Sequence, residues 1–505
     1  MNQVKAGAAL NYVIIGLNIL TGLLYTPFML RCLGQNEYGL YSLVASIIAY
    51  LTLLDFGFGS AIVRYTAKIR ATGTKEEEWS LYGMFLSAYA ILGLLVTIGG
   101  VVLYFNTDRM FDRTMTPDEL QQARIMMALM VGNLAVTFPF CIFGSIISAY
   151  ERFVFQRVLS IVRILLSTAV LIVVLLLGYK AIGLVIVQTV FSISTLLANV
   201  LYCRYKLRIK INFRNFNIPL LKEIAVFSIW NFLGAIVDRI YWGTGQFILG
   251  IYCGTVAVAI FSLGITLMNL YMSMSTSFNS VLLPRITLLA VSGDHDKEIS
   301  DLFIKTGRLQ FCVLSLILSG FIVLGRQFIF IWAGADYAMS YTIALVFFVS
   351  LLCPLIQNVG YTILLARGQQ KFRSIVYLGI AIVSLVCQIL VTPRFGALGC
   401  AIVIGLTLFI GQWVVMNIYY KVRQHIDISE FWREIGKMAI FPTILTGLAL
   451  WLAQRVEIDN WASIGTAGFA FIIIYISTFY CFSMNKYERE ITLAPLKALK
   501  QRLGL

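Results

Sequence analysis

Long apolar runs separated by short polar segments follow one another along the whole chain. A transmembrane helix needs roughly 20 mostly apolar residues, because hydrocarbon offers the backbone no hydrogen-bond partner outside the helix itself. The pattern predicts an all-α, multi-pass membrane protein with fourteen spans. The expected spans are 10–30, 39–63, 81–105, 125–149, 158–178, 181–203, 224–250, 256–283, 311–332, 340–366, 374–392, 397–420, 438–454 and 461–482.

The chain also resembles itself at an offset of about 220 residues: Asn11 and Asn18 correspond to Asn231 and Asp238. Each copy holds six spans, an even number, so both copies have the same orientation. This is a parallel repeat, as in several transporter folds. We predict two six-helix lobes around a central cavity, followed by two extra helices and a tail, with boundaries at 1–210, 211–430 and 431–505.

Composition and charge agree with a membrane protein. Hydrophobic residues make up 59% of the chain and charged residues only 12%, which excludes a soluble enzyme and a disordered chain. The formal charge of +15 would suggest nucleic acid in a soluble protein. Here 29 of the 39 basic residues fall in one set of loops and eight in the opposite set. Positively charged loops stay in the cytoplasm, so we expect both termini to be cytoplasmic and no nucleic-acid partner.

Catalytic and metal-binding patterns are missing from the sequence. It has no Gly-Lys loop for phosphate, and the longest external loop, 106–124, is under twenty residues. The run Asp294-His295-Asp296 reads as a solvated turn rather than a metal site. Cys32 and Cys253 fall at external helix ends, but we expect the cysteines to act as small buried hydrophobes. We therefore expect neither an enzyme nor a cofactor.

Polar residues inside the spans are the candidates for function, because charge in hydrocarbon is costly unless it faces protein or a wet cavity. Asp55 and Asp238 are the two acids placed well inside spans. Asn231 and Asp238 share one face of the seventh span, and Asn18 stands on the matching face of the first. These two faces are predicted to line the cavity. The alternative is that their small and polar residues mediate packing between neighbouring helices.

Three basic residues also fall in or beside spans. Arg239 lies near mid-span and cannot easily reach either interface, whereas Arg163 lies close enough to a span end to snorkel. Arg64 falls at the end of its predicted helix. There it either anchors the helix at the cytoplasmic face or binds the substrate. A cavity with fixed cations and few acids favours an anionic substrate.

The second span and its flanks carry a family resemblance. They read YGLYSLVASIIAYLTLLDFGFGSAIVRYTAK from Tyr38, and this segment resembles the signature of Wzx-type polysaccharide flippases. These proteins form the polysaccharide-transporter branch of the multidrug/oligosaccharidyl-lipid/polysaccharide exporter superfamily. The elements that match include Leu54-Asp55-Phe56-Gly57, Gly59 and Arg64. Further pieces, among them LLPRIT, WAGADY and LLARGQQKFRS, occur in the family's order over essentially the whole chain.

The resemblance implies a flippase of the bacterial inner membrane. Its cargo would be an undecaprenyl-diphosphate-linked oligosaccharide for capsule, O-antigen or exopolysaccharide, moved from the cytoplasmic to the external leaflet by alternating access. Membrane lipids and other polysaccharide-assembly proteins would be its partners. By the same resemblance, Asp55 matches the signature acid and either binds a coupling cation or braces Arg64. The expected cargo-binding residues are Arg239, Arg64, Arg163, Arg31, Asn231 and Asn18, with Asp55 and Asp238 as coupling or structural acids.

Three alternatives stay open. A cation-coupled multidrug exporter of the same superfamily would share the fold, but usually has twelve spans. A peptidoglycan-precursor flippase has fourteen spans and an arginine-bearing cavity. A membrane glycan polymerase or ligase, from a different class, would need a longer external loop. The residues also leave the energy source open among a proton gradient, a sodium gradient and the membrane potential.

Overall fold

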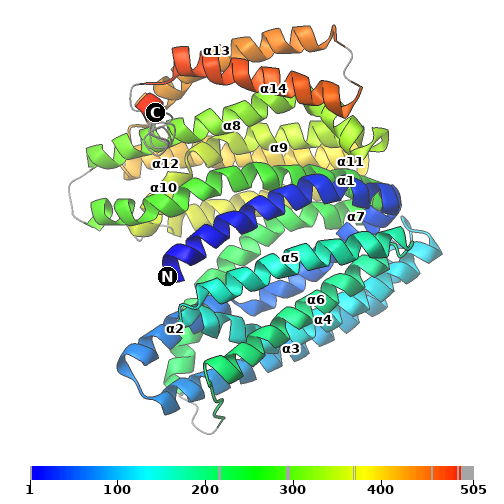
Figure 1. Ribbon diagram of the computed structural model, residues 1–505, viewed down its shortest axis with the longest axis vertical. Helices are drawn as coiled ribbons and strands as arrows, with labels where there is room; N and C mark the ends of the chain where they lie inside the picture. The colour runs from blue at the N-terminus through cyan, green and yellow to red at the C-terminus, as the bar shows by residue number, and fades with distance from the viewer. Residues whose placement is uncertain are drawn as a thin grey trace, which may run out of the picture. The chain divides into compact units, whose positions relative to one another are not determined.

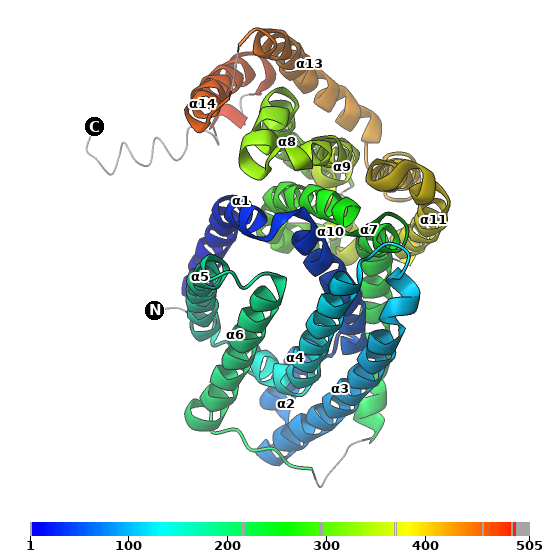
Figure 2. The same cartoon turned by 90° about the vertical axis from the view of Figure 1, so that its right-hand side faces the viewer.

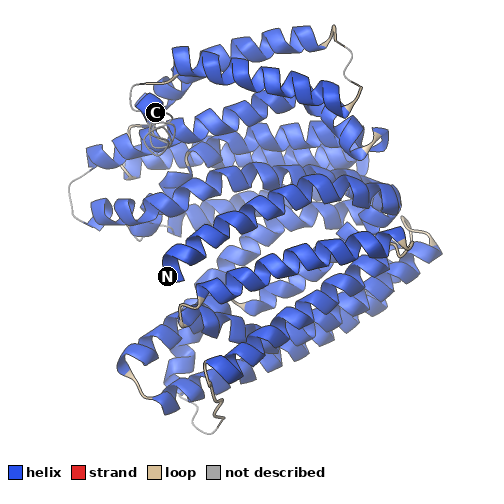
Figure 3. Ribbon diagram, in the orientation of Figure 1, coloured by secondary structure: helices blue, strands red, loops and turns tan. Residues whose placement is uncertain are grey.

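The computed structural model describes residues 3–213, 218–291, 296–367, 369, 371–456, 459–485 and 488–490 (Figures 1 and 3). These ranges contain helices and loops but no strand. Eleven helical segments in them are long and apolar enough to cross a membrane, which confirms the predicted class. The helices are α1 (Gln3–Leu51), α2 (Phe58–Thr72), α3 (Lys75–Phe111), α4 (Pro117–Ala149), α5 (Phe153–Leu176), α6 (Ala181–Leu201), α7 (Ile218–Val291), α8 (Asp296–Ala333), α9 (Ala338–Ile356), α10 (Asn358–Ala366), α11 (Lys371–Leu408), α12 (Met416–Arg423), α13 (Ile428–Ala453) and α14 (Trp461–Thr478).

Three of the longest helices are interrupted by a glycine in a conformation that other residues adopt only with strain. Gly34 in α1, Gly254 in α7 and Gly396 in α11 have φ of 75°, 80° and 59°. Each lies where the sequence pattern separates two neighbouring spans, so each long helix runs from one expected span into the next. Gly34 and Gly254 also stand at the repeat offset and have nearly the same backbone angles. The count of fourteen crossings stays a prediction.

The chain divides into two compact units, and each is described by itself. The first comprises Met1–Ser262 with Thr392–Ala397, and the second Leu263–Val391 with Leu398–Leu505. In the first unit α4 packs between α3 and α6, and α5 packs between α1 and α6 (Figure 2). Aromatic side chains such as Tyr82 and Phe85 fill its core. The lobe boundaries at residues 210 and 430 stay a prediction, and the tail from 491 lies outside the described residues.

Two repeat-related helices cross closely in the first unit. A Cβ atom on Gly39, in α1, would overlap the carbonyl oxygen of Thr255 in α7. Nearby, the Leu43 side chain packs so tightly on Gly250 that a Cβ there would lie 2.6 Å from it. The hydroxyl of Thr114 donates to the Gly250 carbonyl at 2.8 Å. The missing Cβ atoms therefore let the two helices approach closely near the kinks at Gly34 and Gly254.

In the second unit, the expected span 340–366 is divided into α9 and α10. Pro354 has no N–H to donate to the carbonyl of Ser350, one turn earlier, and α9 ends two residues later. The indole N–H of Trp413 donates to that carbonyl at 3.2 Å instead. A side chain from the following helices thus satisfies the backbone group that proline leaves open.

A buried ion-pair network joins α13 and the segment after α14 to α8. The guanidinium of Arg308, in α8, donates to Glu434 of α13 at 2.8 Å and to Glu488 at 2.5 and 3.0 Å. The side chains of Arg308 and Glu488 are 5% and 1% exposed. Arg308 also donates to the carbonyl of Ser483. The two extra helices of the sequence analysis are therefore held by charge as well as by apolar packing on α8.

Substitution of Gly39 by alanine should destabilise the first unit. The new methyl group meets backbone rather than a flexible side chain, so the crossing must open, at a cost of about 1–3 kcal/mol. We expect a lower thermal unfolding midpoint for the detergent-purified protein. Gly16→Ala is the matched control, because nothing lies within 4 Å of a Cβ there. Equal midpoints for the two variants would contradict the close crossing.

Substitution of Arg308 by glutamine should destabilise the attachment of α13 and α14. The buried carboxylate of Glu488 would then lose its cation, whereas Glu434 keeps its ion pair with Lys437 at 2.7 Å. Breaking a buried pair in this way costs about 3–5 kcal/mol. Arg433→Gln is the control, since Arg433 forms an exposed pair with Glu430. Thermal unfolding should show a large loss for the first variant and little change for the second.

Candidate functional site

The sequence Leu54-Asp55-Phe56-Gly57 breaks the second expected span instead of continuing it. Thr52–Asp55 form a 3₁₀ turn, Phe56 and Gly57 take φ of 50° and 71°, and α2 begins at Phe58. Left-handed backbone is costly at phenylalanine and needs support from its surroundings. The Phe56 ring packs on Phe232 of α7, with centroids 4.4 Å apart. The signature therefore marks a helix break held against α7.

Asp55 lies at this break with its carboxylate half-buried. It accepts a hydrogen bond of 2.7 Å from the hydroxyl of Tyr89 in α3 and another from the backbone N–H of Gly57. Phe58 packs edge-on against the Tyr89 ring. Within the described residues Asp55 forms no ion pair, so its partners are Tyr89 and Gly57 rather than Arg64.

Arg239 lies on α7 in a half-exposed position beside an α1–α7 contact. The hydroxyls of Tyr50 and Thr244 are 2.6 Å apart and join the two helices. The Arg239 stem packs on Gly243, where a Cβ would lie 2.9 Å from its Cδ. No ion pair to Arg239 occurs in the described part of the chain. A cation on an apolar helix thus stands beside two hydroxyls, with no carboxylate paired to it among the described residues.

The other predicted site residues are spread over several helices. Asn18 and Arg31 lie on α1, Arg64 on α2, Arg163 on α5 and Asp238 on α7, and all five are exposed. The Arg64 guanidinium carbon lies 5.8 Å from the centre of the Tyr65 ring. The structure brings Arg239 to the contact between α1 and α7, whereas Arg31, Arg64 and Arg163 lie on α1, α2 and α5.

Two predicted features cannot be placed. Asn231 falls within α7, but its side chain lies outside the described residues, as do Asp294 and His295. No group of three metal-ligating side chains occurs in the residues that were described. Cys32 and Cys253 are free thiols.

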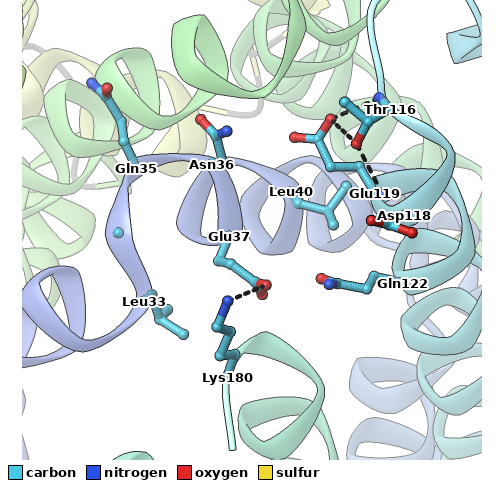
Figure 4. Close-up of a pocket in the computed structure, with 11 residues that line it drawn as sticks. Leu33, Gln35, Asn36, Glu37, Leu40, Thr116, Asp118, Glu119, Gln122 and Lys180 are labelled. Atoms are coloured by element: carbon cyan, nitrogen blue, oxygen red, sulfur yellow. Dashed lines mark hydrogen bonds and ion pairs between the residues drawn. The ribbon is translucent and has the colours of Figure 1, made fainter. Parts of the chain in front are cut away.

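Sequence reasoning missed a polar cavity of about 410 Å³ where α1 bends at Gly34 (Figure 4). Glu37 of α1 forms an ion pair of 3.5 Å with Lys180, at the start of α6. Glu119 of α4 accepts a hydrogen bond of 2.9 Å from Thr255 of α7. The polar lining is completed by Gln35, Asn36, Thr116, Asp118 and Gln122. These residues belong to short segments between spans, and only folding brings them together.

Solved structures of a flippase and of an exporter are similar to this one. A solved lipid II flippase, MurJ, in an inward closed conformation is similar over 94% of this chain and 98% of its own, with a TM-score of 0.72 and 16% identity. An inward-facing multidrug resistance transporter of the MATE family, in the MOP superfamily, is similar over 82% of this chain and 98% of its own, with a TM-score of 0.58 and 14% identity. The fold is therefore that of the MurJ and MATE transporters.

The family follows from the sequence match. The model of the polysaccharide biosynthesis protein family matches residues 4–290, more than half of the chain, and the chain belongs to that family. A membrane protein of Bacillus subtilis (strain 168) named EpsK and described as uncharacterized is 21% identical over 510 residues, covering 97% of both chains. The resemblance read from the second span is thereby confirmed at the level of the family.

Proposed function

We propose that this protein moves a polyprenyl-diphosphate-linked oligosaccharide across the membrane by alternating access. The cargo would be a repeat unit of capsule, O-antigen or exopolysaccharide, taken from the cytoplasmic to the external leaflet of a bacterial inner membrane. Both termini would be cytoplasmic. Membership of the polysaccharide biosynthesis family and the MurJ-like fold support a flippase. The family and fold are those of transporters rather than of enzymes.

Arg239 is the observation that carries the choice of cargo. A diphosphate entering a low-dielectric site needs charge-assisted hydrogen bonds, and a guanidinium offers a planar fork of donors for phosphate oxygens. Arg239 stands on an apolar helix with no ion pair among the described residues, and the hydroxyls of Tyr50 and Thr244 lie beside this part of α7. In the proposal these groups hold the diphosphate. Arg31, Arg64, Arg163, Asn18 and Asn231 are proposed to contact the cargo at other stages of its passage.

Asp55 is the proposed site of cation coupling, with Asp238 as a second candidate. A half-buried carboxylate at a helix break can exchange a proton or bind sodium while neighbouring backbone groups complete the site. The hydrogen bond from Tyr89 orients the Asp55 carboxylate. The Asp55 carboxylate also accepts a hydrogen bond from the Gly57 N–H. A change in the charge of Asp55 would therefore alter the hydrogen bonding that supports the helix break.

The alternative functions share much of this evidence. A multidrug exporter fits the fold less completely, since the MATE similarity leaves more of the chain uncovered than the MurJ similarity does. Drug exporters of that kind also need a cavity suited to cations, which an unpaired arginine opposes. A peptidoglycan-precursor flippase would carry the same lipid diphosphate with a different sugar, and the polysaccharide family match favours the oligosaccharide.

Substitution of Arg239 by alanine should abolish transport while leaving membrane insertion intact. Loss of one partner from a desolvated charge pair costs about 2–5 kcal/mol, which corresponds to roughly 30-fold weaker cargo binding or more. The measurement is translocation of a labelled polyprenyl-diphosphate oligosaccharide by the protein reconstituted in liposomes.

Two variants control this experiment. Arg239→Lys keeps the charge and should retain part of the activity, whereas Arg423→Ala removes an exposed cation at the end of α12 and should be neutral. Wild-type transport rates in the Arg239→Ala protein would contradict the assignment. Transport of a cationic dye but not of the lipid-linked sugar would favour the exporter, and selective transport of lipid II would favour the precursor flippase.

Substitution of Asp55 by asparagine should remove the dependence of transport on pH or on sodium. The amide neither releases a proton nor attracts a cation, although it still fills the same space. Transport would be measured with imposed proton and sodium gradients. Tyr89→Phe is the comparison, because it removes the hydrogen bond and leaves the carboxylate. If both variants slow transport equally and keep its ion dependence, Asp55 is structural.

A further inference from the structure

The segment that follows α6 carries a regular alternation of basic and apolar residues. After a short π-helical turn at Tyr202–Lys206, the chain runs without helix to residue 213. Leu207, Ile209 and Ile211 are partly buried and pack on the core of the first unit. The residues between and before them form what we call the basic strip, and all four are exposed: Arg204, Lys206, Arg208 and Lys210.

The alternation in sequence is matched by an alternation in burial. The apolar residues Leu207, Ile209 and Ile211 bind the segment to the core, while Arg208 and Lys210 between them are exposed. The segment is not a regular strand, because Arg208 has a left-handed backbone with φ of 51° where the chain leaves the π-helical turn. The strip is therefore displayed by packing and is not a loose basic loop.

Backbone contacts hold the segment against α3. The N–H of Asn212 donates to the carbonyl of Trp79 at 3.1 Å, and a Cβ on Gly83 would overlap the Asn212 carbonyl oxygen. The Lys210 ammonium lies 5.3 Å from the centre of the Trp79 ring. Near the other end, the N–H of Ile209 donates to the carbonyl of Cys203 at 3.1 Å. Both ends of the strip are thus fixed on the first unit.

The four cations have no ion-pair partner in the part of the chain that the structure describes. None of them forms an ion pair in the described parts of the chain. Of the three acids in the first turn of α3, Glu76 is exposed and the other two are already engaged. Glu77 caps the helix with Thr74, and Glu78 binds Lys75, Tyr82 and Tyr150. The basic strip is therefore available to bind an anionic partner outside the protein.

The position of the strip favours a lipid surface over a soluble partner. It begins three residues after Leu201, where the apolar helix α6 ends, so it stands at the level where a membrane gives way to water. Two aromatic residues, one within the strip and one after it, are also exposed: Tyr205 is 73% and Phe213 is 53% exposed. Aromatic side chains prefer the interface, and basic residues beside a membrane span attract anionic headgroups.

We propose that the basic strip is a docking surface for anionic phospholipid headgroups at this face of the membrane. It holds the phosphates of lipids such as phosphatidylglycerol against the segment that leads from α6 to α7. This assignment goes beyond the proposed transport function and does not depend on the cargo. It is consistent with the predicted orientation, which puts residues 204–223 in the cytoplasm.

The test compares lipid binding by the full chain and by a variant without the strip. Protein purified in neutral detergent is titrated with phosphatidylglycerol or phosphatidylcholine, and bound lipids are counted by native mass spectrometry. R204Q/K206Q/R208Q/K210Q should bind phosphatidylglycerol about tenfold more weakly and leave phosphatidylcholine binding unchanged. Added salt should weaken phosphatidylglycerol binding to the parent protein, because these charges are exposed.

Matched variants separate the strip from general charge and from misfolding. K297Q/K371Q/K421Q/R423Q removes four exposed cations elsewhere and should bind phosphatidylglycerol like the parent. R204K/K206R/R208K/K210R keeps every charge and should also bind normally. K206Q/K210Q removes half of the strip, keeps the packed residues and should lose part of the affinity.

Three results would overturn the proposal. The first is unchanged phosphatidylglycerol binding by the strip variant in a folded protein. The second is an equal loss in the variant with four cations removed elsewhere, which would make the effect one of net charge. The third is salt-insensitive binding by the parent. Transport assays are independent of all three, so a failed flippase proposal would not decide this one.

Discussion

Hydrocarbon supplies no hydrogen-bond partners for the backbone, and this constraint governs the structure. It makes the chain helical. Wherever a helix bends or stops, it also requires another hydrogen-bond partner for the backbone groups that the helix leaves unpaired. Gly34 and Gly254 bend α1 and α7 with backbone angles that glycine adopts without strain. At Pro354 the indole of Trp413 satisfies the carbonyl that proline leaves open. At the break after Asp55, the carboxylate itself accepts the Gly57 N–H. Asp55 therefore satisfies a backbone N–H at the helix break and is also the candidate for cation coupling.

The same constraint separates two kinds of charge on apolar helices, one buried and one half-exposed. Arg308 is enclosed by Glu434, Glu488 and a backbone carbonyl, so its charge is fully matched inside the protein. Arg239 has no comparable carboxylate in the described residues, although it lies on an equally apolar helix. A matched buried pair holds elements together, whereas a cation with no ion pair in the described residues can take an anionic partner from outside the chain. That contrast is why Arg239, and not Arg308, is the cargo candidate.

Part of the candidate site was predictable from single residues. Asp55 and Arg239 are conspicuous because charged residues are rare within apolar spans. Their surroundings were not predictable. Tyr89 and Tyr50 look like ordinary aromatic residues of a span until α3 and α1 are packed in place. Glu37 and Lys180 are 143 positions apart, and no local sequence pattern predicts their ion pair.

The sequence by itself determined the class of protein and the approximate positions of its spans, because hydropathy acts over about 20 neighbouring residues. Loop charge also predicts its orientation. The family could be read from ordered motifs in the second span and beyond. Only the tertiary structure decided that this span breaks at Asp55, that Tyr89 holds the carboxylate, and that Arg308 anchors the two extra helices. Such contacts depend on how helices rotate and cross, as at Gly39 and Thr255, and that geometry is set by packing between distant segments.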